Sequence, residues 1–354
     1  FIAGNLARVR FNSELDSTNP TIGLRWKPID SLMLRASYGT AFLPPTYSQL
    51  VPGNVSLVLS AGVPQTIQVI DPRRGNSLTL VEYATGGNPN LKPQESKNLN
   101  LGLVFEPTFL PALRVNAEWY RLEQENIIVN PTAALILNNE SRFAERITRA
   151  AVTPGDPYGV GVLTFIDYSM FNANRGETEG VDLSVNYRLD TDNLGTFNFA
   201  LGGTKILSYE IQTAIDAPLT DIVNQVAYQG PLQYRANASL SWAFNNWNVG
   251  WLSNYFGSYS QYNVGGVTTY TSAQGSSTIP SQLYHDIYAS YQFDKAGGGG
   301  LADSLLSNVG VQVGIKNVFD KVPPFDAYYA ASNYYSPFGD PRLRSFYLTL
   351  QKKF

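Results

Sequence analysis

Side chains along most of the chain alternate between apolar and polar with a period of two residues. Successive side chains of a strand point to opposite faces of a sheet, so this period predicts strands with one apolar and one polar face. With a partial strand at residues 7–11, we expect about twelve strands, the others being 22–26, 32–40, 99–105, 113–120, 181–188, 197–207, 232–244, 249–255, 287–293, 309–319 and 346–354.

The segment from 232 to 244 shows the pattern over its greatest length. We expect one face to carry Leu232, Tyr234, Ala236, Ala238, Leu240 and Trp242, and the other to carry Gln233, Arg235, Asn237, Ser239 and Ser241. Because hydrocarbon offers no hydrogen bonds, an apolar set of this length on one face is typical of a strand that faces lipid.

The connections between these segments alternate between short and long. Short turns are expected at 27–30, 106–111, 190–195 and 245–247, and long loops at 42–93, 130–175, 211–231, 261–281 and 320–341. The glycine-rich stretch at 294–308 is an exception, a long connection on the short-turn side. Outer-membrane barrels sort their loops in this way, with short periplasmic turns and long extracellular loops. The sequence therefore predicts an all-β fold, an antiparallel transmembrane β-barrel.

The amino-acid composition also limits the classes of protein to which this chain can belong. Aromatic residues reach 13% and charged residues only 15%, while no apolar run approaches the roughly 18 residues of a spanning helix. Lysine and arginine number 25 against 28 acidic residues, so there is no basic surplus for nucleic acid. The chain has no cysteine, which excludes disulfides, thiolate zinc sites and cysteine nucleophiles within it.

Five stretches, in order, resemble motifs of TonB-dependent receptors. They are residues 35–45 (Arg-Ala-Ser-Tyr-Gly-Thr-Ala-Phe-Leu-Pro-Pro), 87–96 (Gly-Asn-Pro-Asn-Leu-Lys-Pro-Gln-Glu-Ser), 126–128 (Asn-Ile-Ile), 174–182 (Asn-Arg-Gly-Glu-Thr-Glu-Gly-Val-Asp) and 316–321 (Lys-Asn-Val-Phe-Asp-Lys). The resemblance implies that residues 1–354 are the C-terminal portion of such a barrel. This portion would hold roughly the last twelve strands of a larger barrel and no plug domain.

The same resemblance implies a function: energised uptake of a scarce solute such as a siderophore, cobalamin, oligosaccharide or peptide across the outer membrane of a Gram-negative bacterium. The implied partners are a small-molecule ligand, outer-membrane lipid and lipopolysaccharide, the barrel-assembly machinery, and a TonB-type energising protein that would act through an N-terminal part. No cofactor is implied. Two alternatives stay open, namely a self-contained small barrel acting as a passive pore or enzyme, and a surface adhesin.

Two loops carry candidate ligand-binding residues. Residues 139–151 are predicted to form a short helix with Asn139 as N-cap, which places Arg142, Arg146 and Arg149 on one face for an anionic ligand or lipopolysaccharide phosphate. The alternative is a solvated face neutralised by glutamates. The last loop carries Phe325, Tyr328, Tyr329, Tyr334 and Tyr335, which suit planar or sugar-like ligands but equally pack loops together.

The polar face of the strands is unusually charged. We expect Arg25, Arg35, Arg114, Glu118, Asp182, Arg188, Arg235 and Lys316 to face the lumen and a plug domain. In the last strand Phe346, Leu348, Leu350 and Phe354 share one face and resemble the signal read by the assembly machinery. We further expect this chain alone to form a curved sheet with two free edges.

Enzymatic chemistry finds little support. His285 is the only histidine, and its neighbour Asp286 points to the opposite face of the same strand, so the two cannot form a catalytic pair. One histidine and no cysteine leave only carboxylates for a metal, and these lack calcium-loop spacing. We therefore expect a protein that is not an enzyme.

Overall fold

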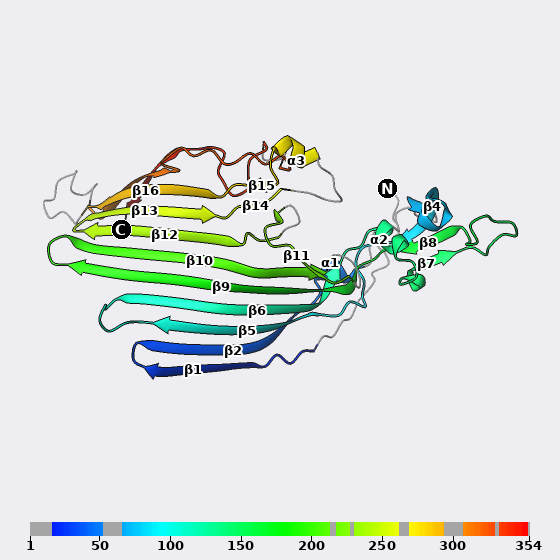
Figure 1. The fold of residues 1–354 in the computed structure, drawn as a ribbon, viewed down its shortest axis with the longest axis horizontal. Coiled ribbons are helices and arrows are strands. Elements are labelled where there is room, and N and C mark those ends of the chain that lie inside the picture. Colours follow the sequence, from blue (N-terminus) through cyan, green and yellow to red (C-terminus); the bar gives the residue numbers. More distant parts are fainter. Residues whose placement is uncertain are drawn as a thin grey trace, which may run out of the picture.

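The computed structural model describes residues 16–51, 66–212, 217–226, 230–261, 269–293, 307–329 and 333–352. Eleven long strands form one antiparallel sheet in which each strand pairs with the next (Figure 1). They are β1 (Thr21–Ile29), β2 (Leu32–Leu43), β5 (Gln94–Phe105), β6 (Leu113–Val129), β9 (Phe171–Thr191), β10 (Gly195–Gln212), β12 (Tyr234–Phe244), β13 (Trp247–Phe256), β16 (Gln282–Gln292), β17 (Val309–Lys316) and β18 (Ser345–Lys352).

The strand pattern predicted from the sequence is confirmed for these eleven strands. The partial strand at 7–11 and the end of the last predicted strand, residues 353–354 with Phe354, lie outside the described residues. The short β11 (Leu219–Asp221) adds a twelfth strand to the sheet by pairing with β10. Strands β9 and β10 continue past the predicted ends, so residues 171–175 and 211–212 are strand rather than loop. Among the described helices, none is long and apolar enough to cross a membrane.

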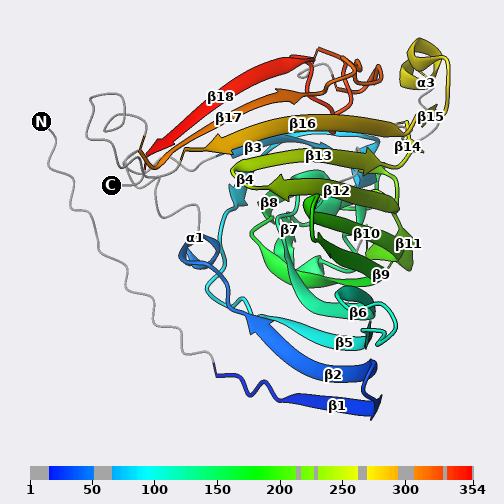
Figure 2. The ribbon, with the colours of Figure 1, turned by 90° about the vertical axis from the view of Figure 1, so that its left-hand side faces the viewer.

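The sheet is strongly curved and open (Figure 2). Its edges are β1 and β18, and no ladder joins these two strands within the described part of the chain. The expectation of a curved sheet with two free edges is confirmed for those residues. Both edges therefore present backbone donors and acceptors that another strand can pair with.

The apolar face of the sheet is its more exposed face. In β5 the side chains of Leu99, Leu101 and Leu103 are 36%, 47% and 36% exposed, whereas those of the adjacent Asn98 and Asn100 are half-buried. Side chains on the inner side of a curved sheet crowd together, so the polar face is the concave one. Water-soluble sheets bury their apolar face, and this sheet has the opposite polarity.

Short turns and long loops lie at opposite ends of the strands (Figure 1). The turn between β9 and β10 closes on Gly195, whose φ of 80° favours glycine and where a Cβ atom would collide with the carbonyl oxygen of Ala243. The Nε1 of Trp242 donates to the carbonyl oxygen of Leu194 at 2.6 Å, which ties this turn to the neighbouring strand.

Two long loops combine into a small folded unit beyond the strand ends (Figure 1). The loop between β2 and β5 supplies α1 (Tyr47–Leu50), β3 (Thr66–Asp71), the 3-10 turn Pro72–Arg74 and β4 (Ser77–Ala84). The loop between β6 and β9 supplies α2 (Ala133–Asn138), the 3-10 turn Ala144–Arg146, β7 (Ile147–Arg149) and β8 (Leu163–Asp167). Strands β4 and β8 pair in parallel, giving a four-stranded sheet in the order β3-β4-β8-β7.

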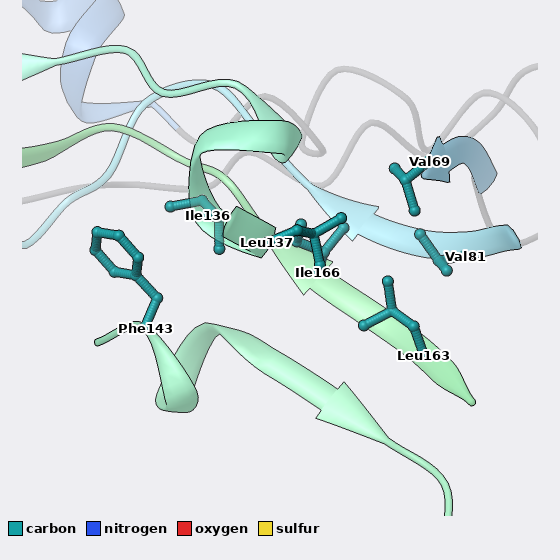
Figure 3. Close-up of a cluster of buried hydrophobic side chains, with 7 residues drawn as sticks. All are labelled: Val69, Val81, Ile136, Leu137, Phe143, Leu163 and Ile166. Carbon is teal, nitrogen blue, oxygen red and sulfur yellow. The ribbon is translucent and has the colours of Figure 1, made fainter. Parts of the chain in front are cut away.

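This loop unit has its own apolar core (Figure 3), formed by Val69, Val81, Ile136, Leu137, Phe143, Leu163 and Ile166. Each of these side chains is at most 6% exposed. Burial of seven apolar side chains from two loops stabilises the unit, and Phe171 of β9 packs against this core. The two long loops that the sequence predicts at 42–93 and 130–175 are therefore folded over these residues.

A second cluster joins three further loops. It contains β14 (Tyr259–Ser260), α3 (Thr269–Gln274) and β15 (Thr278–Ile279) and buries Leu232, Tyr259 and Ile279 against Phe256 and Phe338. Leu232 is only 3% exposed and precedes β12, so its predicted place on the lipid-facing side is wrong. Loop packing, rather than the bilayer, covers this side chain.

Candidate functional site

Charged side chains of several strands lie in one cross-strand row on the concave face. The strand register places opposite one another Arg25, Arg35, Gly102, Glu118, Asp182, Thr204 and Arg235. Arginines occupy both ends of this row, and carboxylates occupy its middle. Along this row the concave face therefore presents a positive region, then a negative region, then a second positive region.

Gly102 shapes the centre of this row. Arg35 reaches across β5 to Glu118, with 2.5 Å between Nη2 and Oε2. A Cβ atom at position 102 would lie 2.6 Å from Nε of Arg35, so a side chain there would block the contact. The hydroxyl of Thr204 donates to Oδ1 of Asp182 at 2.5 Å. Each carboxylate of the row thus has a donor from another strand.

The other predicted lumen residues also lie on this face. Arg114 lies 3.5 Å from Glu106 near the short turns, and Arg188 donates to both carboxylate oxygens of Asp190. The guanidinium of Arg235 lies 5.4 Å from the centre of the Phe256 ring, and Nζ of Lys316 lies 5.9 Å from that of Tyr347. Contact of these residues with a plug domain stays a prediction.

An ion-pair network holds the two halves of the loop unit together. Arg149 on β7 donates to both oxygens of Asp71 at 2.7 and 2.9 Å, and to both oxygens of Glu140 at 2.8 and 2.6 Å. Asp71, from the other loop, is fully buried. Arg73 adds a more exposed contact to Glu140 at 3.0 Å. The network therefore links residues 78 positions apart in sequence.

The predicted helix at 139–151 is wrong. The helix lies earlier, over Ala133–Asn138, where Thr132 is the N-cap and its hydroxyl accepts from the amide of Leu135. Asn139 is instead the C-cap. Ile136 and Leu137 of this helix are buried in the core of the loop unit. Residues 147–149 form a strand that pairs with β8.

The three arginines consequently do not form a helical stripe. Arg149 is committed to Asp71 and Glu140, and Arg146 donates to the carbonyl oxygen of Ser169 while its guanidinium lies 4.8 Å from the centre of the Phe171 ring. An anion at Arg149 would have to displace two carboxylates. Anion binding by Arg142, Arg146 or Arg149 stays a prediction.

The network makes the loop unit sensitive to acid. Burial raises the pKa of Asp71, but Arg149 and the backbone amide of Arg73 outweigh burial and hold this pKa below its ordinary value of 3.8. Hydrogen bonds from Arg149 likewise hold the pKa of Glu140 below 4.5. A carboxyl group whose pKa is lower in the folded than in the unfolded state stabilises the fold at pH values above its unfolded-state pKa. This stabilisation is lost as the pH falls through the folded-state pKa.

We therefore expect the loop unit to keep constant stability from pH 7 to about pH 5 and to lose it progressively below about pH 4. Hydrogen–deuterium exchange of the β3 and β4 amides, compared with those of β10 in the same sample, measures this directly. Equal pH dependence of exchange protection in the loop unit and in β10 would show that the network does not control the unit.

The tyrosines of the last loop mainly pack against one another. Tyr328 and Tyr329 form an edge-to-face pair with ring centres 5.1 Å apart, and Tyr329 also donates to the carbonyl oxygen of Val226. Tyr335 forms a β-bridge with Phe325. Tyr334 lies 6.0 Å from Phe325 between ring centres, and both side chains are 47% exposed. Phe325 and Tyr334 are therefore the more exposed aromatic pair of this loop, and ligand binding by Tyr328, Tyr329, Tyr334 or Tyr335 stays a prediction.

Buried hydrogen bonds beneath these aromatics connect the loops to the sheet. The Tyr259 hydroxyl contacts Oδ2 of Asp326 at 2.7 Å and Oγ of Ser336 at 2.9 Å. Gln282, at the start of β16, donates to the same Ser336 oxygen at 2.7 Å. Burial of Tyr259 raises the pKa of its hydroxyl well above the usual range. The hydroxyl therefore stays protonated and donates to Asp326.

Sequence reasoning missed the loop unit, although it left a signal. Residues 66–71 and 77–84 both alternate, and Gly75 and Asn76 between them adopt φ values of 65° and 59°, as a tight hairpin requires. The partner strands in the other loop carry no such local signal. Within the described residues, no cluster of three or more histidine, aspartate or glutamate side chains is arranged to hold a metal.

His285 and Asp286 point to opposite faces, as expected. Nδ1 of His285 contacts Oγ of Ser253, whereas Asp286 accepts from the backbone amide of Asn317. These two residues of β16 form no His–Asp pair.

A sequence model of the family described as TonB dependent receptor-like, beta-barrel matches residues 3–318. The chain therefore belongs to this family. A comparison with curated protein sequences finds no match. The family match confirms the resemblance that the five motifs indicated.

Solved structures share the fold at low identity. The ferric enterobactin receptor PfeA of Pseudomonas aeruginosa, solved as a mutant, is 17% identical with a TM-score of 0.57, and the match covers 94% of this chain and 39% of that protein. The siderophore receptor PirA of Acinetobacter baumannii is 16% identical with a TM-score of 0.56, covering 94% and 40%. The chain thus spans about 40% of the length of these receptors.

Proposed function

We propose that this chain is the later part of an outer-membrane receptor that takes up a scarce solute at the expense of energy from a TonB-type protein. The observation that carries this proposal is the reversed polarity of the sheet, whose apolar convex face suits lipid and whose charged concave face suits a water-filled or plugged lumen. Family membership adds the energised mechanism. Transport, rather than catalysis, is the role that this arrangement supports.

The folded loops would form the extracellular ligand surface. Both loop clusters lie at the end of the strands opposite the short turns, which in outer-membrane barrels is the outer side (Figure 1). We propose a siderophore-type solute as the first ligand to test, because both related structures are described as siderophore receptors. Further strands would pair with β1 and β18, and a plug would meet the charged row. The barrel-assembly machinery would insert the complete barrel into the outer membrane.

Uptake of a radiolabelled ferric siderophore by cells that produce the full-length protein tests this function. We expect uptake to require the energising protein. We also expect the double variant Phe325→Ala, Tyr334→Ala to weaken ligand binding about thirtyfold, since each of the two aromatic contacts contributes about 1 kcal/mol. Phe109→Ala is the matched control, because Phe109 is 82% exposed in a turn at the other end of the strands.

Other outcomes would replace the proposal. Uptake that continues at the same rate without the energising protein would indicate a passive pore. Binding of ligand without any uptake would indicate an adhesin or a sensor. If the double variant and Phe109→Ala bind alike, the ligand surface lies elsewhere on the loops.

A further inference from the structure

Glycines and tyrosines alternate in one cross-strand row on the concave face of the last four strands. The strand register places opposite one another Gly250 of β13, Tyr288 of β16, Gly314 of β17 and Tyr347 of β18. Phe346, the neighbour of Tyr347, is 73% exposed and belongs to the apolar convex face. Because successive side chains of a strand point to opposite faces, Tyr347 and the rest of its row lie on the concave side.

The glycines of this row leave room for the tyrosine rings of the neighbouring strands. A Cβ atom at Gly250 would overlap the ring of Tyr288, and one at Gly314 would overlap the ring of Tyr347. Each ring therefore lies across a glycine, against the sheet, and turns a face toward the lumen. Since β13 and β17 are two strands apart, the two rings are about 10 Å from each other. Tyr288 and Tyr347 are called the tyrosine platform below.

Uncharged hydrogen-bonding side chains border the tyrosine platform on the side of the short turns. The row next to it consists of Asn248, Ser290, Gln312 and Thr349. Nε2 of Gln312 donates to the hydroxyl of Tyr347 at 3.0 Å, which fixes the position of this ring. On the side of the loops, Nζ of Lys316 lies 5.9 Å from the centre of the same ring. Ring faces with polar groups at their edges suit a solute that carries aromatic rings with polar substituents.

The tyrosine platform lies deeper in the concave face than the aromatic loop. Gln282 at the start of β16 is hydrogen-bonded to Ser336 of that loop. At the usual rise per residue of a strand, Tyr288 is about 20 Å further along β16 than Gln282. A solute that leaves the loops on this side of the lumen would therefore pass the tyrosine platform on its way to the short turns.

We propose that the tyrosine platform is a second binding site for the transported solute, at which an aromatic ring of the solute stacks on Tyr288 or Tyr347 during passage. The inference rests on the proposed function. Passage requires binding that is favourable enough to draw the solute in and weak enough to release it. Single stacking contacts meet this requirement, because each contributes only about 1 kcal/mol, or about fivefold in affinity.

Uptake of a radiolabelled ferric tris-catecholate, whose catechol rings are aromatic, tests the platform in cells that produce the full-length protein. For the double variant Tyr288→Leu, Tyr347→Leu, we expect the maximal uptake rate to fall about tenfold. Binding of the same probe to de-energised cells, which reports on the loops and on the amount of assembled protein, should change less than about twofold. The double variant Tyr288→Phe, Tyr347→Phe keeps both rings and should keep the uptake rate.

Tyr120→Leu is the matched control for a purely structural role of these tyrosines. Tyr120 also lies across a glycine, Gly180, but in the half of the concave face that carries the charged row. We expect this variant to keep its uptake rate within about twofold. The inference is overturned if the double leucine variant takes up the probe at the unsubstituted rate. It is also overturned if the double phenylalanine variant or Tyr120→Leu loses as much uptake as the double leucine variant.

A thiol label added after assembly tests the same site without an effect on folding. The chain contains no cysteine, so Thr349→Cys places a unique thiol of this chain beside Tyr347 on the exposed part of the concave face. A bulky maleimide there should lower uptake about tenfold, whereas the same label at Asn186→Cys on β9 should not. Equal effects at the two positions overturn the inference. Absence of probe uptake by the unsubstituted protein refutes the proposed function, whereas unchanged uptake in labelled Thr349→Cys refutes the tyrosine platform alone.

Discussion

Replacing Arg149 with methionine is expected to open the loop unit and leave the main sheet intact. The guanidinium neutralises the fully buried Asp71 and also holds Glu140, so its loss leaves two carboxylates without their main partner. Removing one member of a buried ion pair costs about 3 kcal/mol. Hydrogen exchange of the β3 and β4 amides should therefore become about a hundredfold faster.

Arg73→Met is the matched control for this experiment. Arg73 contacts the same Glu140 at 3.0 Å, but its side chain is 51% exposed. Exposed ion pairs contribute at most about 1 kcal/mol, so exchange should change less than about fivefold. If both variants exchange alike, or if Arg149→Met exchanges at the rate of the unsubstituted protein, the network does not hold the two loops together.

Replacing Leu240 with arginine is expected to destabilise the assembled barrel by about 2–4 kcal/mol. Leu240 lies near the middle of β12 on the apolar face, where its side chain is 49% exposed. An arginine at this depth would have to carry its charge into hydrocarbon. Urea titration of the full-length protein in phospholipid vesicles measures the loss in the free energy of unfolding.

Ser239→Arg separates this effect from a general intolerance of arginine. Ser239 adjoins Leu240 on the same strand but belongs to the concave face, where other arginines already lie. We expect a change below about 1 kcal/mol for this variant. Equal losses for the two variants would show that both faces of β12 meet the same surroundings, which contradicts a membrane-spanning sheet.

The main sheet could be predicted from the sequence because its signal is local. Alternation in β12 or β6 repeats every two residues, and the bilayer requires that pattern along the whole crossing. The same rule placed every charged residue of the predicted lumen set on the concave face. The alternation rule failed for Leu232. An apolar side chain just before a strand can be covered by loops as well as by lipid, and the pattern does not distinguish the two.

Apart from the β3–β4 hairpin, the loop unit could not be predicted, because its other contacts are not local. Asp71 and Arg149 belong to different loops, and nothing near either residue indicates the other. Strands β4 and β8 pair in parallel across about eighty residues, a partnership that neither segment encodes by itself. The misplaced helix has a similar cause. Asn139 is a good N-cap by residue type, but the apolar core selects the preceding turn, capped by Thr132.

The folded loops bear directly on the proposed function. A ligand-binding surface requires side chains held in fixed positions, and both loop clusters have buried cores beneath their exposed side chains. In the second cluster, the hydrogen bonds of Ser336 to Tyr259 and Gln282 anchor the aromatic loop to the start of β16. The aromatic loop is therefore attached to a strand of the main sheet.

The membrane position of the sheet is the central claim, and labelling of single cysteines along β12 tests it most directly. The chain contains no cysteine, so each substitution from position 235 to 242 introduces one unique thiol into it. In the full-length protein in vesicles, we predict that positions 236, 238, 240 and 242 carry probes quenched by lipid-soluble quenchers. Positions 235, 237, 239 and 241 should instead react with water-soluble reagents. Loss of this alternation, or its reversal, would contradict the account.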